Sequence, residues 1–144
     1  MPDPDPIFTA AKDLIVSKLK DDPQAHLHVA PLVLEFTRTE LAKPGSATKR
    51  VLTETCHGVL SGLVLLDKDI KVGAIETLKG LTAILQERSG DPMRTMCYAL
   101  EGIARIGTSV APGVLSDIRD DIEAEFMGAG EQFSKFTAPY FKKD

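Results

Sequence analysis

Apolar residues recur along this chain at the spacing of an α-helix, and proline or glycine interrupts that pattern at short intervals. The first run has apolar residues three and four positions apart, at Ile7, Ala11, Leu14, Ile15 and Leu19. Breaks follow at Asp21–Pro23, Lys43–Ser46, Ser89–Pro92 and Ala111–Gly113. This alternation predicts short helices, each with one apolar face that must be buried against its neighbours.

We therefore expect an all-α fold, a compact bundle of five to six amphipathic helices with short Pro/Gly-containing loops. The 144 residues, 43% of them hydrophobic, are enough for one domain with its own core. Within the single helical domain 1–144, residues 1–5 are expected to form a flexible lead-in and residues 131–144 a candidate C-terminal arm. The apolar pattern leaves open whether the helices on either side of Asp67–Asp69 are one continuous helix.

Helix boundaries are predicted from capping residues. Asp5, Ser46, Asp69 and Asp91 are each placed to cap a helix, and a proline follows Asp5 and Asp91 at the first helical position. The second helix is expected from about Pro31 to Ala42, after a short helical turn. The last is expected to follow the break at Ala111–Gly113 and to end near Ala138, weakened midway by its glycines.

Position in the bundle is predicted best for the third helix. From Val59 onward this segment is apolar nearly all round, and such a helix belongs at the centre of a bundle. Leu63 lies in the middle of that stretch.

Composition excludes several classes of protein. A formal net charge of −4 and a pI near 5.4 argue against nucleic-acid binding, which needs a clustered basic face. The longest apolar run, Val59–Leu66, is far shorter than the roughly 20 residues of a transmembrane helix. The N-terminus lacks the features of a signal peptide. With only two cysteines, Cys56 and Cys97, we expect a reducing, cytoplasmic location.

Four glycines are predicted to mark close contacts between helices. The pattern Leu-x-Gly-apolar begins at Leu60, Leu78 and Leu100, and one further glycine lies four residues before the glycine of the first copy. The predicted helix-packing glycines are Gly58, Gly62, Gly80 and Gly102. A second interpretation is that these small residues leave a groove for an apolar ligand. The repeat is also similar, in pattern alone, to amphipathic repeats of phasins and apolipoproteins, which coat lipid or polymer surfaces.

Residues that carry chemistry do not assemble into a recognisable site. Glu54 and His57 form one Glu-x-x-His motif, but a helical di-iron site needs two such motifs and further carboxylates. Only a symmetric dimer would supply the second copy. The histidines and cysteines show no zinc-ligand spacing at positions 26, 28, 56, 57 and 97. No catalytic motif is present, so we expect no catalytic, cofactor-binding or metal-binding residues. We therefore expect that the protein is not an enzyme.

Aromatic residues are concentrated at the C-terminal end. Five of the eight lie in the last 19 residues, and they form the candidate interface: Phe126, Phe133, Phe136, Tyr140 and Phe141. They either pack on their own bundle or dock on a second subunit, since aromatics are enriched where proteins meet.

The sequence therefore favours a non-enzymatic helical bundle that acts through self-association, as a homodimer, or through protein binding. One alternative is a phasin-like protein that coats a lipid or polymer surface by peripheral binding. The other is a protein that binds a small apolar ligand or a metal within the bundle. The identity of any partner or ligand is not encoded in a recognisable motif.

Overall fold

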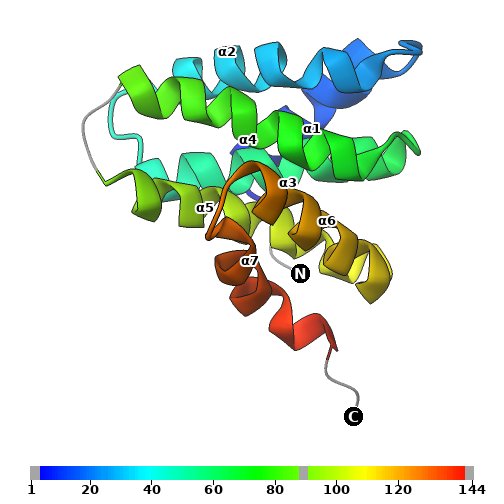
Figure 1. Cartoon of the computed structure of the whole chain (residues 1–144). Coiled ribbons are helices and arrows are strands. Elements are labelled where there is room, and N and C mark those ends of the chain that lie inside the picture. Colours follow the sequence, from blue (N-terminus) through cyan, green and yellow to red (C-terminus); the bar gives the residue numbers. More distant parts are fainter. Residues whose placement is uncertain (1–3, 88–90, 142–144) are drawn as a thin grey trace.

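The computed structural model describes residues 4–87 and 91–141, and in these residues helices pack on helices with no strand (Figure 1). The all-α bundle is confirmed, but it has seven α-helices within these ranges, rather than five to six. The α-helices are α1 (Pro6–Leu19), α2 (Val29–Leu41), α3 (Thr48–Leu65), α4 (Ile70–Glu87), α5 (Pro92–Ala104), α6 (Pro112–Glu125) and α7 (Ala129–Thr137). Three short 3-10 segments join or extend them: η1 (Ala25–Leu27), η2 (Arg105–Thr108) and η3 (Ala138–Phe141). None of the helices in this part of the chain is both long and apolar enough to cross a membrane.

Three of the four predicted caps are confirmed. The Asp5 carboxylate accepts a hydrogen bond of 2.8 Å from the backbone N–H two residues further on, and Asp91 does the same at 3.0 Å. Asp69 accepts from the N–H groups two and three residues on, both at 3.1 Å. Each carboxylate satisfies N–H groups that have no partner within the first turn of a helix.

The predicted cap at Ser46 is wrong. Helix α3 begins at Thr48, and Ala47 precedes it without a side-chain cap. The Ser46 hydroxyl instead donates 2.9 Å to the carbonyl of Leu41, at the end of α2. A serine between two helices can satisfy either an N–H of the next helix or a carbonyl of the preceding one, and here the carbonyl of α2 is within reach.

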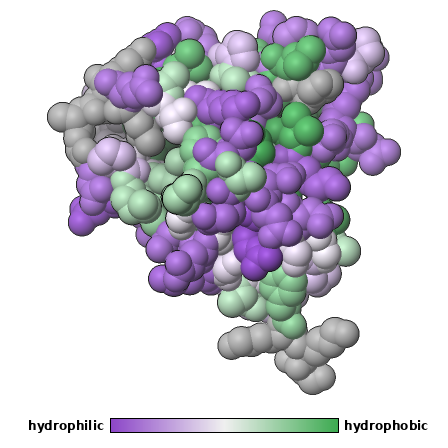
Figure 2. Space-filling view, viewed as in Figure 1, coloured by the Kyte–Doolittle hydropathy of each residue, from purple (hydrophilic) through white to green (hydrophobic). Residues whose placement is uncertain are grey.

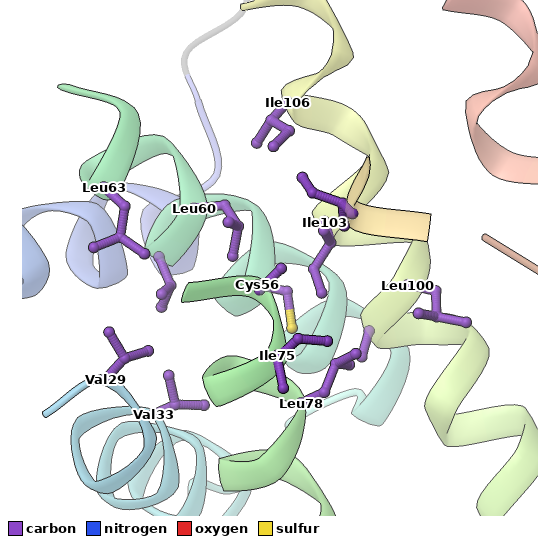
Figure 3. Packing of buried hydrophobic residues seen from close by; sticks show 14 of the residues in the cluster. Val29, Val33, Cys56, Leu60, Leu63, Ile75, Leu78, Leu100, Ile103 and Ile106 are labelled. Atoms are coloured by element: carbon purple, nitrogen blue, oxygen red, sulfur yellow. The ribbon is translucent and has the colours of Figure 1, made fainter. Parts of the chain in front are cut away.

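The centre of the bundle is α3, as its apolar sequence predicts. Ten of its eighteen residues are buried, and it packs against α1, α2, α4 and α5. Figure 3 shows Cys56 and Leu60 of α3 facing Ile75 and Leu78 of α4 and Ile103 of α5.

Helices α3 and α4 are separate. Asp67, directly after α3, has a φ of 56°, a left-handed conformation that an α-helix cannot contain. The next residue, Lys68, donates from its ammonium group to the carbonyl of Asp22 at 3.1 Å. The chain therefore reverses here, and α4 returns along α3.

The prediction of one long C-terminal helix is wrong. Helix α6 ends at Glu125 and α7 starts at Ala129, with Gly128 between them at a φ of 91°. The Glu123 carboxylate accepts from the N–H groups of Gly128 at 2.8 Å and Gly130 at 3.0 Å, and so caps the start of α7. The glycines thus allow a change of direction, and α7 packs against α5 and α6.

Candidate functional site

The glycines of α3 lie against α1. A Cβ atom built on Gly58 would lie 2.5 Å from the Phe8 carbonyl oxygen and 2.8 Å from the Ala11 Cβ. A Cβ on Gly62 would lie 2.9 Å from the Ile15 Cβ. Real Cβ contacts are longer than this, so α1 and α3 approach as closely as they do because neither glycine has a side chain.

The two other glycines have similar surroundings. A Cβ on Gly80 of α4 would lie 2.7 Å from the carbonyl oxygen of Ala30 in α2. A Cβ on Gly102 of α5 would collide with the Thr53 carbonyl oxygen and lie 3.0 Å from the Cys56 Cβ of α3. At all four positions the space of the missing side chain is filled by a neighbouring helix, so these glycines do not line an empty groove.

The C-terminal aromatics contact their own bundle to different extents. Phe133 is completely buried in the main core. Phe126, Phe136 and Tyr140 are partly buried against that core, and Phe141 is 45% exposed. In residues 131–141 the candidate arm is therefore α7 and η3, packed on the bundle; positions 142–144 lie outside the described residues. The predicted interface with a second subunit remains a prediction, and Phe141 is its most exposed aromatic.

Tyr140 holds the end of the described chain against η2. Its ring lies over Gly107, where an added Cβ would come within 2.5 Å of the ring carbons. Only a residue without a side chain leaves room for this contact. Tyr140 thus ties η3 to the bundle, although the segment projects from the body at the lower end of Figure 1.

Exposed side chains lie along α7 and just beyond each of its ends. Met127, just before the helix, is 92% exposed, and Phe141 follows it at the other end. Glu131 and Lys135 lie between them and are also exposed. The face of the molecule in Figure 2 is mainly hydrophilic with small apolar patches, one of them on the projecting lower end. We call Met127, Glu131, Lys135 and Phe141 the outer face of α7.

The cysteines are both free. Cys56 is completely buried, and burial raises the pKa of its thiol far above the usual range, so the reactive thiolate does not form. Cys97 is half-buried on α5. The Cys56 sulfur lies among aliphatic side chains in Figure 3, where the thiol acts as a small apolar group.

His57 lines a surface groove of about 290 Å³ between α1, α3 and the turn after η2. Its ring centroid is 4.5 Å from that of Phe8, and the two planes are tilted by 44°. The Lys12 ammonium lies 5.8 Å from the Phe8 centroid. The complete lining, which we call the His57 groove, is Phe8, Lys12, His57, Ser61, Val64, Leu65 and Ser109.

The electrostatics of the groove keep His57 neutral. Burial, together with the smaller effect of the positive charges of Arg105 and Lys12, lowers the pKa of His57 to about 4. Arg105 is itself held by two carboxylates, Glu54 at 2.7 Å and Glu101 at 3.2 Å. Because Glu54 is engaged by Arg105, the Glu-x-x-His motif does not present a free carboxylate beside the imidazole.

The other two histidines lie between the break after α1 and the start of α2. His28 Nδ1 lies 2.5 Å from a carboxylate oxygen of Asp22. A backbone hydrogen bond from Gln24 and the contact with His28 lower the pKa of Asp22. The His26 side chain lies outside the described part of the structure. Among the residues that are described, no three His, Cys, Asp or Glu side chains are grouped so as to hold a metal ion.

Sequence reasoning considered His57 but missed the groove around it. Phe8, Lys12 and Ser109 come from distant segments, and no local motif connects them with His57. The only sequence signal was indirect, since Gly58 and Gly62 bring α1 against the face of α3 that carries His57 and Ser61.

In comparisons of the chain with protein-family models, curated proteins and solved structures, no match was found.

Proposed function

We propose that this protein is a non-enzymatic helical bundle that binds a second copy of itself through the outer face of α7. The observation that carries the proposal is the order of side chains on that face. It runs from apolar Met127 through acidic Glu131 and basic Lys135 to apolar Phe141. This order is complementary to itself when two copies run antiparallel, and a two-fold dimer uses one patch in this way.

The charged pair sets the register of the proposed dimer. With the two-fold axis near residues 133–134, Glu131 lies opposite Lys135 of the second copy, and Lys135 lies opposite its Glu131. Neither side chain makes an ion pair or hydrogen bond with another described residue, so both are available. Such charges contribute little affinity in water but select the orientation of the two helices.

The apolar ends of the face supply the attraction. In the same register Met127, just before α7, meets Phe141 at the end of η3 in the second copy. Met127 is 92% and Phe141 45% exposed, so both leave apolar surface in contact with water in the single copy. Burying that surface in a dimer is favourable. Methionine and aromatic residues are typical of interface cores.

The test exchanges the two charges. We expect Glu131→Lys alone, or Lys135→Glu alone, to weaken the dimer, since each sets like charges against each other. The double variant Glu131→Lys/Lys135→Glu is expected to restore the dimer, because the exchange recreates both pairs. Light scattering after size exclusion, at low salt and over a range of protein concentrations, measures the mass.

The apolar contact has its own test and a matched control. Met127→Ser with Phe141→Ser should shift the protein to a monomer. Leu27→Ser should leave the mass unchanged, since Leu27 is a 54% exposed apolar residue on η1, outside the proposed interface. A wild-type protein that stays monomeric at all concentrations contradicts the proposal, as does a dimer unaffected by every α7 variant.

We further propose that the protein works in the cytoplasm. The support is that Cys56 and Cys97 are both free, as is usual in a reducing compartment. Microscopy of the tagged full chain in its own cell tests this, and a membrane-bound or exported pool contradicts it.

A further inference from the structure

The polar side chains of the His57 groove have unused hydrogen-bonding capacity. Lys12, His57, Ser61 and Ser109 make no side-chain hydrogen bond or ion pair with any other described residue. They come from three parts of the fold, α1, α3 and the turn after η2, yet they line one hollow. A ligand in the groove therefore meets an ammonium group, two hydroxyls and an imidazole. None of these four groups is already hydrogen-bonded through its side chain to another described residue.

The charge of the groove suits an anion. No carboxylate lines it, and Lys12 is the one cation among its lining residues. Arg105, whose charge acts on His57, is balanced by Glu54 and Glu101, and none of these three residues lines the groove. One unbalanced positive charge, beside a neutral imidazole with a single N–H, matches a ligand with one negative charge.

The remaining lining is apolar. Phe8, Val64 and Leu65 form this part, and Leu65 is 63% exposed. The volume of about 290 Å³ lies just below the range of about 300–1,000 Å³ that is usual for the pockets of drug-sized ligands. The groove therefore has room for a small ligand with one polar end and a short hydrocarbon part.

We propose that the His57 groove binds a small monocarboxylate with a short alkyl chain. The Lys12 ammonium and the serine hydroxyls hold the carboxylate, and the chain lies on Phe8, Val64 and Leu65. This inference is independent of the proposed dimer, because no residue of α7 lines the groove.

The first experiment titrates the wild-type protein with hexanoate and follows the imidazole ring protons of His57 by nuclear magnetic resonance. The loss of one signal set in His57→Gln assigns them. We expect saturable shifts with hexanoate, at least about tenfold weaker binding of acetate, which lacks the chain, and the same for hexan-1-ol, which lacks the charge. If hexan-1-ol binds as well as hexanoate, the groove does not recognise a carboxylate. If hexanoate causes no shift, the groove is not a binding site for it.

The second experiment removes the proposed contacts one at a time. Lys12→Met keeps the aliphatic stem and removes the charge, and should weaken hexanoate binding about tenfold. Leu65→Ser should also weaken it. Lys18→Met, an exposed lysine of the same helix outside the groove, is the matched control and should bind as wild type does. Unchanged affinity in Lys12→Met overturns the assignment.

A pH titration gives a third, independent readout. The charges that face His57 are Lys12 from α1 and Arg105 from η2, the latter with Glu54 of α3 and Glu101 of α5. Free His57 should titrate with a pKa of about 4. A carboxylate bound beside it stabilises the protonated ring, so at about pH 5.5, where a carboxylic acid is still mainly ionised, saturating hexanoate should raise the protonated fraction of His57. An unchanged protonated fraction at saturation contradicts a carboxylate in this groove.

Discussion

Helices α3 and α7 both depend on glycine, but for different reasons. Helix α3 is enclosed by four other helices, and its glycines allow a neighbour to approach. Helix α7 packs against α5 and α6 at the edge of the bundle. A Cβ atom added to Gly128, just before α7, would have no atom within 4 Å, but the backbone there has a φ of 91°. The same residue type therefore serves packing in the centre and backbone conformation at the edge.

This difference extends to what each helix is free to do. Because α3 is largely buried, few of its side chains can contact a binding partner, apart from those that line the His57 groove. The exposed side of α7 keeps charged and apolar groups in water, where a second copy can reach them. The comparison predicts that variants of α3 affect stability most, and that variants of α7 affect it less.

The largest effect is expected for Leu63→Asp in α3. Leu63 is 1% exposed, so the carboxylate would be buried without a partner, and we expect a loss of about 4 kcal/mol or more in the free energy of unfolding. Thermal and urea unfolding followed by circular dichroism measure it. Leu65→Asp, two residues on and 63% exposed, is the control and should change little. Equal effects of the two variants would show that α3 is not central.

A smaller effect is expected for Gly58→Ala. The new methyl group would meet the Phe8 carbonyl oxygen, part of a backbone that cannot turn aside, and α1 must shift at a cost of about 1–3 kcal/mol. Gly113→Ala, near the start of α6 with nothing within 4 Å, should instead stabilise by about 0.5 kcal/mol. Urea unfolding of both variants gives the sign, and stabilisation by Gly58→Ala would disprove the close approach.

The smallest loss in the free energy of unfolding is expected for Gly128→Ala. There is space for the methyl group, and the left-handed backbone alone opposes it, at a cost of about 1 kcal/mol. The loss should appear mainly as faster hydrogen exchange in α7, with little change in α3. Gly128→Asn should cost less, because asparagine tolerates this conformation. Equal acceleration in both helices would mean that α7 does not open separately from the bundle.

Local sequence signals predicted the fold class and the starts of α1, α4 and α5. Asp5, Asp69 and Asp91 act through N–H groups two or three residues away, so the information needed to predict them is contained in a few residues. Ser46 failed because two local partners compete for one hydroxyl. The reversal at Gly128 was underestimated, because a glycine in a helical pattern signals weakness but does not reveal where the chain turns.

The candidate sites were less accessible to sequence reasoning. The aromatic cluster was visible, but nothing local distinguished Phe133, which is buried, from Phe141, which is 45% exposed. The His57 groove joins Lys12, His57 and Ser109, which are far apart in the chain.

The periodicity of apolar residues by itself determined that this chain forms packed helices, because each amphipathic helix must bury one face. It also located the central helix, since a segment that is apolar all round has no stable position in water. Only the tertiary structure decided which helix fills the space beside each glycine, which aromatics stay exposed, and which polar groups share a groove. Those outcomes depend on how helices that are distant in sequence pack together, and short-range sequence patterns do not determine that packing.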